Sequence, residues 1–298
     1  MPKIKGMSVI TLTDWLDQGR SRAELKGALR DGDLRMLRRG VVTDAVSAAP
    51  VDLHRLRVQA AADVIGPDTL FAQESAAVLH GLPLLTPRLA EVVAVRTGGG
   101  HGQVTGGLHT RSSDVADGDV TRIDGLPVTG LARTVADLLR RLPFPEAVMV
   151  ADAGLRQGLV REELLERTAS GRGCRMARAA IEFADKRSES AGESLSRVRI
   201  HRAGLPVPEL QFVMLGSDGG FLGRLDFWWE EQRLAGEFDG MAKYSTLRAP
   251  GVTTAEVLRA EKRREQAIVA EGNRLVRWIW ADLWNGNLER LLGRLLRP

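Results

Sequence analysis

Three acidic residues lie inside segments of the last third of the chain that otherwise have the composition of strands. Asp226 belongs to the run GRLDFWW (223–229), and Glu237 and Asp239 belong to LAGEFDG (234–240). Acidic side chains are disfavoured in strands. Because side chains alternate between the two faces of a strand, Glu237 and Asp239 share a face and Phe238 points the other way. The pattern predicts a cluster of carboxylates on one face of a small sheet.

A short hairpin would bring two of these carboxylates together. If Glu231 and Gln232 form a two-residue turn, Asp226 pairs with Glu237 across the two strands. Paired side chains share a face and lie roughly 5 Å apart. Two carboxylates at that distance repel each other unless a cation lies between them, and hard oxygen ligands suit Mg²⁺. A slip of one residue in the register would place them on opposite faces, and surface charges on a half-exposed sheet remain the alternative interpretation.

The segment around these carboxylates has a definite predicted order of elements. Ser190 and Glu193 form an S-x-x-E capping box that begins a helix, and SDGG (217–220) predicts a tight turn. The predicted order is α-β-β-β-α-β-α, with helix 190–203, strands 210–215, 222–229 and 233–239, helix 253–271, strand 274–280 and helix 283–296.

The first segment, residues 1–46, has the order of a winged helix-turn-helix. Helices are predicted over 11–18 and 21–30, with a capping box at Ser21 and Glu24 and a stop at Gly32. A basic hairpin over 34–43, turning at Gly40, comes after the second helix. Helix, turn, helix and wing in this order is typical of a small DNA-binding domain. The alternative is a helical protein-interaction domain with a charged face.

Residues 47–185 predict a mixed α/β segment without a catalytic signature. Helices are expected over 52–65, 73–79, 133–142, 145–156, 161–168 and 176–185, and strands over 92–96 and 126–129. The run TGGGHGQVTGG (97–107) is expected to be a loop, because it lacks the G-K-[ST] of a phosphate-binding P-loop. The fold class is therefore α/β in the broad, multi-domain sense, with boundaries at 1–46, 47–185 and 186–298.

Composition limits the class of protein further. The one cysteine, Cys174, excludes a disulfide framework and fits a reducing compartment. No run of about 18 apolar residues predicts a membrane span, and Asp14 and Asp17 come too early for a signal peptide, so a cytoplasmic location is expected. The formal charge of +4 is concentrated at the two ends of the chain, where it would attract a phosphate backbone.

Several runs of the last segment resemble the PD-(D/E)XK nuclease superfamily, in particular its very-short-patch-repair-endonuclease-like branch. They are ESLSR (193–197), GLPVPELQ (204–211), GRLDF (223–227), EFDG (237–240), EKRRE (261–265) and GNRLVRW (272–278). The resemblance covers roughly residues 188–285 and implies a restriction-endonuclease-like αβββαβ fold.

The resemblance also implies a set of site residues. Asp226 and Glu237, helped by Asp239, would hold Mg²⁺ or Mn²⁺, with the carbonyl of Phe238 as an additional ligand. Glu193 would hold a metal-bound water, unless it only caps its helix or pairs with Arg197. The metal would lower the pKa of its bound water and stabilise charge on the phosphate.

Two lysines, Lys243 and Lys262, are the candidates to bind the scissile phosphate. On its helix, the basic run 262–264 is otherwise expected to be a solvated face. The chain departs from the family at two positions. Asp239 stands where the E-x-K motif has its lysine, and Lys243 stands where the branch often has a histidine after D-G. Lysine can contact a phosphate but cannot serve as a neutral imidazole base or ligand.

The first segment resembles the winged-helix domain of AbiEi-type antitoxins. The matching runs are SRAEL (21–25) and GDLRMLRRGVV (32–42), and GLPVTGLARTVADL (125–138) resembles the segment after that domain in such proteins. The resemblance implies that helix 21–30 enters the major groove with Arg22, Lys26 and Arg30 facing DNA. It also implies a wing that contacts phosphates through Arg35, Arg38 and Arg39.

Two functions are expected from these features. The first is a DNA-binding protein whose C-terminal domain hydrolyses phosphodiester bonds with Mg²⁺. The second is an AbiEi-like antitoxin or repressor that binds DNA without cutting, with a cognate toxin as a candidate partner. Neither needs an organic cofactor or a membrane. RNA in place of DNA is a third alternative. The histidines His54, His80 and His201 are expected to be structural, and Ser75 and Cys174 have no recognisable nucleophile context.

Overall fold

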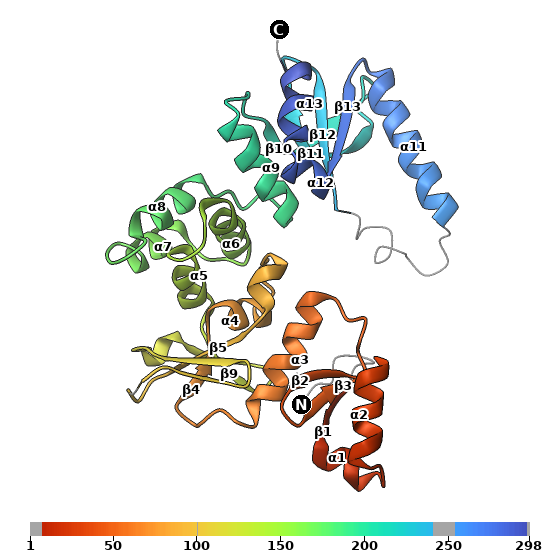
Figure 1. The fold of residues 1–298 in the computed structure, drawn as a ribbon. Coiled ribbons are helices and arrows are strands. Elements are labelled where there is room, and N and C mark those ends of the chain that lie inside the picture. The colour runs from red at the N-terminus through yellow and green to blue at the C-terminus, as the bar shows by residue number, and fades with distance from the viewer. Residues whose placement is uncertain (1–7, 100, 241–253, 297–298) are drawn as a thin grey trace. The chain divides into compact units, whose positions relative to one another are not determined.

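The computed structural model describes residues 8–99, 101–240 and 254–296 (Figure 1). The chain is mixed α/β, with three separate sheets. Its residues form two compact units: the first holds Met1–Val150 with Gly158–Glu182, and the second holds Ala151–Gln157 with Phe183–Pro298. In the residues that were searched, no helix is both long and apolar enough to cross a membrane.

The first sheet belongs to the predicted winged-helix segment. Its strands are β1 (Val9–Thr11), β2 (Arg35–Arg38) and β3 (Val41–Thr43), in the order β1-β3-β2. The helices are α1 (Leu12–Asp17) and α2 (Arg22–Asp31). The predicted helices and hairpin are confirmed, and β1, a strand that no pattern predicted, completes the sheet. Trp15, Leu34 and Val42 form the core beneath α1 and α2.

Local sequence explains why these two helices begin and end where they do. The Ser21 hydroxyl accepts the Glu24 amide, and the Glu24 carboxylate accepts the Ser21 amide, so both partners of the predicted capping box are satisfied. Thr11 and Asp14 form the same arrangement on α1. Gly32 ends α2 in the left-handed conformation, with φ +84°, which costs glycine little.

A six-stranded sheet forms the centre of the first unit, in the order β6-β7-β5-β4-β9-β8. The strands are β4 (Thr69–Phe71), β5 (Val92–Arg96), β6 (Gln103–Thr105), β7 (Leu108–Ser112), β8 (Val120–Ile123) and β9 (Leu126–Thr129). Helices α3 (Pro50–Ala62) and α4 (Gln73–Leu79) pack on this sheet, and Val58, Phe71 and Val128 are fully buried between them. Helices α5 (Leu131–Leu139), α6 (Phe144–Arg156), α7 (Arg161–Arg167) and α8 (Cys174–Phe183) come next along the chain.

The glycine-rich run was wrongly predicted to be a loop throughout. Gln103–Thr105 is β6, which forms an antiparallel hairpin with β7 through Gly106 and Gly107. Both glycines have positive φ, the backbone geometry that a tight hairpin turn requires. Strands β4, β7 and β8 were not predicted either. These strands are short, and they form because they pair with strands that are distant in sequence. A local sequence pattern does not predict such pairing.

The second unit contains a four-stranded sheet, β10-β11-β12-β13. Strands β10 (Glu209–Leu215), β11 (Phe221–Trp229) and β12 (Leu234–Asp239) are antiparallel neighbours, and β13 (Arg274–Ile279) runs parallel to β12. Helices α9 (Ala191–Arg202) and α11 (Thr254–Ala270) lie at the positions predicted for them (Figure 1). The predicted closing helix is instead two helices, α12 (Trp280–Trp284) and α13 (Asn287–Leu295), because Gly286 breaks it with φ +75°.

The two faces of this sheet are covered by different helices. On one face, Phe238 contacts α9 at Gly192, and the Trp278 indole donates a 2.7 Å hydrogen bond to the Ser196 hydroxyl. On the other face, Glu237 pairs with Arg264 of α11. Because neighbouring residues of β12 contact different helices, the acidic face of the sheet is the face that α11 covers.

Candidate functional site

The predicted register of the acidic hairpin is confirmed. Trp229 pairs with Leu234, Trp228 with Ala235 and Phe227 with Gly236. The same register continued by one residue places Asp226 opposite Glu237. The Arg233 amide donates to the Glu230 carbonyl at 2.9 Å, which closes the turn around Glu231 and Gln232. The two carboxylates therefore come from neighbouring positions of adjacent strands.

Two arginines contact the Glu237 carboxylate. One of its oxygens lies 2.7 Å from Arg264 Nη2, and the other accepts a 2.9 Å hydrogen bond from Arg277 Nε. Arg277 stands beside Glu237 on the parallel strand β13. Glu237 retains 13% of its side-chain exposure, so these pairs form where water screens charge weakly.

The network extends along α11 with alternating charge. Arg264 also lies 2.6 Å from Glu261, and Arg277 Nη1 lies 3.2 Å from Glu265. Partial burial works against the charged form of Arg264, but its hydrogen bonds to Glu261 and the charge of Glu237 outweigh this effect and raise the arginine pKa above its ordinary value. Burial also lowers the pKa of Arg277, but its carboxylate partners, Glu237 first, outweigh burial and raise it. Both guanidinium groups stay charged at every accessible pH.

Arg264 corrects a sequence expectation. The run Lys262–Arg264 was expected to be a solvated helix face, and Lys262 and Arg263 are exposed as expected. Arg264 instead points to the sheet and holds Glu237. A signal was present in the sequence, since Glu261 and Arg264 are three residues apart and so share one side of a helix. Arg277 was missed because only the parallel pairing of β12 and β13 brings it to Glu237.

The other predicted site residues on this hairpin are placed as follows. Asp226 Oδ2 accepts a 2.9 Å hydrogen bond from the Phe238 amide, and Asp239 is half-buried at the end of β12. Lys262 is exposed on α11, and Lys243 lies outside the described residues. Among the described residues, no group of three or more His, Cys, Asp or Glu side chains is close enough to hold a metal ion. Of these carboxylates, Glu237 is already bound by two arginines.

Glu193 is buried at the start of α9. Its carboxylate accepts from the Ser190 hydroxyl at 2.7 Å, from the Glu189 amide at 2.8 Å and from the Gln211 side-chain amide at 2.9 Å. Gln211 lies between the paired residues 210 and 212 of β10, opposite Asp226 of β11. Its backbone has φ +55°, unusual for a residue with a side chain. Glu193 is therefore hydrogen-bonded, through Gln211, to β10, which pairs with the strand that carries Asp226.

The suggested pairing of Glu193 with Arg197 is wrong. Arg197 instead lies 2.9 Å from Asp152, a fully buried carboxylate near the end of α6. Asp152 also accepts the Asp185 amide at 2.7 Å. Burial raises the pKa of Asp152 even though the Arg197 charge lowers it. This pair lies in the second unit and joins α6 to α9.

The predicted DNA-contacting residues lie on α2 and the hairpin. Arg22, Lys26, Arg35 and Arg39 are exposed. Arg30 is exposed and pairs with Asp31 at 3.0 Å. Arg38 is half-buried and its guanidinium donates to the Ala60 carbonyl of α3. Arg38 is therefore hydrogen-bonded to a different element of the fold.

His54 and Ser75 form a buried pair. The His54 Nε2 lies 3.0 Å from the Ser75 hydroxyl, and its Nδ1 lies 3.1 Å from the Leu89 carbonyl. Both residues are fully buried, and the Ser75 oxygen also accepts the Val93 amide. Desolvation lowers the pKa of His54. With no access for a substrate, the pair serves to join α3, α4 and β5.

Comparison with known proteins supplies little beyond this geometry. No family model matches the chain. Two curated proteins from Mycobacterium tuberculosis, "Uncharacterized protein MT2308" of strain CDC 1551 / Oshkosh and "Uncharacterized protein Rv2248" of strain ATCC 25618 / H37Rv, are each 40% identical over 124 residues. That match covers 40% of this chain and 45% of each relative, so the aligned part is about half of their length.

One solved structure, the RV2827C protein from Mycobacterium tuberculosis, matches 58% of this chain and 71% of its own, with 16% identity and a TM-score of 0.37. At that TM-score the likeness carries no argument. The chain is thus similar to a pair of mycobacterial proteins whose titles state no activity.

Proposed function

We propose that this protein binds DNA through its winged-helix segment and that its C-terminal unit is a metal-dependent, endonuclease-like domain. The observation that supports the proposal is the hairpin register, whose printed pairs run to Phe227 and Gly236 and so bring Asp226 and Glu237 to the next position of each strand. Asp239 shares a face with Glu237 by strand alternation. Hard oxygen donors grouped in this way suit Mg²⁺ or Mn²⁺.

A cation at this position would be held by Asp226, Glu237 and Asp239, with the Phe238 carbonyl as a further donor. It would activate a water and neutralise charge on the phosphodiester. Glu237 would have to release at least one of its contacts to Arg264 or Arg277. A released guanidinium could then bind a phosphate oxygen, since its planar fork matches that group. Lys262 and Lys243 remain the proposed phosphate contacts.

Cleavage of supercoiled plasmid tests this proposal. The wild-type protein should nick the plasmid with Mg²⁺ or Mn²⁺ and not with EDTA. Asp226→Asn, which keeps an acceptor for the Phe238 amide, should reduce the rate at least ~100-fold. Glu231→Gln, an exposed carboxylate of the same hairpin turn, should cut like the wild type. Metal-dependent cutting that survives Asp226→Asn would show that the nuclease lies elsewhere or is a contaminant.

The second candidate function is a DNA binder that does not cut, such as an AbiEi-like antitoxin or a repressor. The arginine pairs on Glu237 favour it, because two permanent cations already neutralise the carboxylate that a metal would use. Under this alternative the sheet is a scaffold or the docking surface of a partner such as a cognate toxin. Tight DNA binding without cleavage in any divalent metal would support it.

DNA binding itself is tested on α2. Arg22→Ala with Lys26→Ala should weaken binding, and the slope of log K against log salt should fall by about 0.9 for each phosphate that the variant no longer neutralises. Arg38 is a poor choice for this test, since its hydrogen bond to Ala60 ties it to the fold. Arg172→Ala, an exposed arginine of a loop after α7, is the control. An unchanged salt slope in the double variant would remove α2 from the interface.

A further inference from the structure

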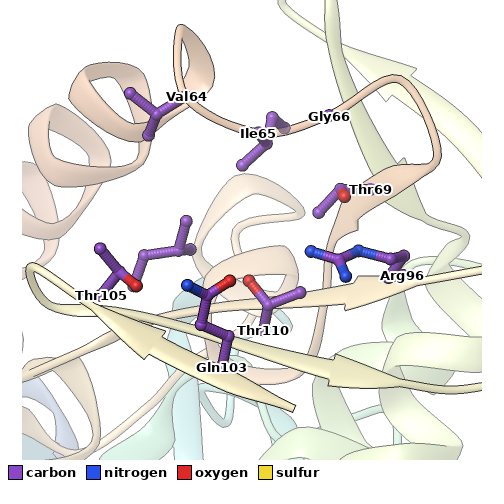
Figure 2. Close-up of a pocket in the computed structure, with 9 residues that line it drawn as sticks. Val64, Ile65, Gly66, Thr69, Arg96, Gln103, Thr105 and Thr110 are labelled. Carbon is purple, nitrogen blue, oxygen red and sulfur yellow. The ribbon is translucent and has the colours of Figure 1, made fainter. Parts of the chain in front are cut away.

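A cavity of about 200 Å³ opens on one face of the six-stranded sheet. Figure 2 shows the Arg96 guanidinium and the polar ends of Gln103 and Thr110 directed into the same space, with Val64 and Ile65 across from them. The cavity lies where α3 has ended and the chain turns back toward β4. None of the residues that line the cavity belongs to the acidic hairpin or to α2.

The strand register explains why the polar groups meet. Thr69 of β4 pairs with Arg96 of β5, and Thr110 of β7 pairs with Gln103 of β6. Ala94 pairs with Thr110, and Arg96 comes two residues after Ala94, so these side chains all share one face. Further along, this face becomes the apolar core around Phe71 and Val128. The polar residues therefore replace core residues at one end of the same face.

These polar groups are not used by the fold. Within the described ranges, the Arg96 guanidinium makes no hydrogen bond or ion pair, and the hydroxyls of Thr69 and Thr110 have no protein partner. The cavity lining includes no acidic side chain. Thr69 is 3% exposed and Thr110 is 9% exposed. Arg96 is half-buried, and the open cavity leaves its guanidinium and the two hydroxyls accessible to a small molecule that enters it.

The donors define the chemistry of that molecule. A guanidinium binds an oxyanion through two parallel hydrogen bonds. The hydroxyls of Thr69, Thr105 and Thr110 and the Gln103 amide add donors beyond those that a two-oxygen carboxylate needs. A phosphate monoester, with three free oxygens, matches this set better. Since a water takes up about 30 Å³ in the liquid, the cavity holds only a small ligand.

We propose that this cavity binds a small organic phosphate, with its phosphate on Arg96 and the threonines and its carbon portion against Val64, Ile65 and Leu108. The site is independent of the DNA-binding and nuclease proposals. A dinucleotide cofactor is too large for it, because pockets for ligands of that size run from about 300 Å³ upward.

Titration calorimetry on the full chain tests the site, with orthophosphate, glycerol phosphate and acetate as probes at constant ionic strength. Glycerol phosphate should bind at one site, orthophosphate more weakly, and acetate weakest. Arg96→Gln should weaken binding of glycerol phosphate about 10- to 100-fold, and Thr110→Val about 2- to 10-fold. Arg111→Gln is the matched control, since Arg111 is exposed on the opposite face of β7 and should leave the affinity unchanged.

The outcomes that overturn the proposal are distinct from failures of folding. Saturable phosphate binding that persists in Arg96→Gln, that is abolished equally in Arg111→Gln, or that acetate matches in affinity would contradict it. So would the absence of saturable binding to either phosphate. If Arg96→Gln does not fold, Arg96→Lys keeps the charge without the fork and should show a smaller but measurable decrease in affinity.

Discussion

At the scale of single residues, two glycines decide how closely the layers of the second unit approach each other. A Cβ on Gly192 would overlap the Phe238 ring, so α9 lies directly on β12 at this point. A Cβ on Gly236 would come within 2.7 Å of the Trp278 ring. Because interiors are packed at crystal-like density, neither contact can relax without moving a helix or an indole.

Gly192→Ala should therefore lower the free energy of unfolding by about 1–3 kcal/mol, the usual cost of overpacking a core. Urea denaturation followed by tryptophan fluorescence measures this, since Trp278 is buried in the same layer. The control is Gly293→Ala in α13, where a Cβ meets nothing within 4 Å. The control should be neutral or slightly stabilising, because alanine favours a helix over glycine. Equal destabilisation of both variants would contradict the close contact.

The buried His54 makes the stability of the first unit depend on pH. Burial lowers its pKa in the folded state, while the unfolded chain titrates near its ordinary value of about 6.5. Below that pH the unfolded state binds more protons than the folded state, so stability falls as pH falls and recovers as pH rises. His54→Gln should flatten this dependence and cost about 1–3 kcal/mol at a pH of about 7.5.

Denaturation curves between about pH 5 and pH 8, either side of the ordinary histidine pKa, measure the His54 contribution. His201→Gln is the control, because His201 is exposed and should leave the slope against pH unchanged. A slope that is the same in the wild type and in His54→Gln would show that other groups cause it.

At the scale of elements, one buried ion pair holds the last turn of α6 against α9. Asp152 is fully buried, and Arg197 retains 11% of its side-chain exposure. Arg197 also donates to the Ser188 hydroxyl and the Phe183 carbonyl, so both of its Nη atoms have partners in the fold. A buried charge such as that of Asp152 or Arg197 destabilises the fold when its partner of opposite charge is removed.

Asp152→Ala leaves Arg197 buried without its carboxylate and should cost about 3–5 kcal/mol of unfolding free energy. Asp152→Asn should cost less, because the amide can still accept the Asp185 amide hydrogen bond. Asp31→Ala breaks the Arg30–Asp31 pair, whose side chains are 78% and 56% exposed, and should change stability by under about 1 kcal/mol. A small effect of Asp152→Ala would mean that the α6–α9 junction does not depend on this pair.

At the scale of the whole molecule, the chain passes between its two units three times. Residues 151–157 belong to the second unit, although 144–150 of the same helix and 158–182 belong to the first. A boundary drawn at residue 183 would therefore remove Asp152 from the unit that needs it. The two units have separate cores, which indicates that a local change is felt mainly within its own unit.

Hydrogen exchange measured on the full chain can separate the two units. Gly192→Ala should speed exchange in α9 and β12 and leave α3 and β5 as they are in the wild type. His54→Gln at a pH of about 5.5, below the ordinary histidine pKa, should leave α9 and β12 unchanged. Equal acceleration in all four elements after either substitution would show that the chain unfolds as a single cooperative unit.

Local chemistry in the sequence determined most helices and the acidic hairpin. Capping residues at Ser21 and Ser190 start their helices from contacts within one turn, and the turn at Glu231 and Gln232 sets the register that pairs Trp229 with Leu234 and Phe227 with Gly236. These interactions span few residues, so their sequence patterns are sufficient. The DNA-binding and metal-binding roles stay predictions.

Only the tertiary structure decided what surrounds those residues. Arg277 reaches Glu237 through a parallel pairing across 40 residues, and Arg197 reaches Asp152 across 45. Arg96 meets Thr110 through the parallel pairing of β5 with β7, a strand that local patterns missed. Such contacts depend on which strands become neighbours, and that choice is made by burial of the whole core rather than by any short stretch of chain.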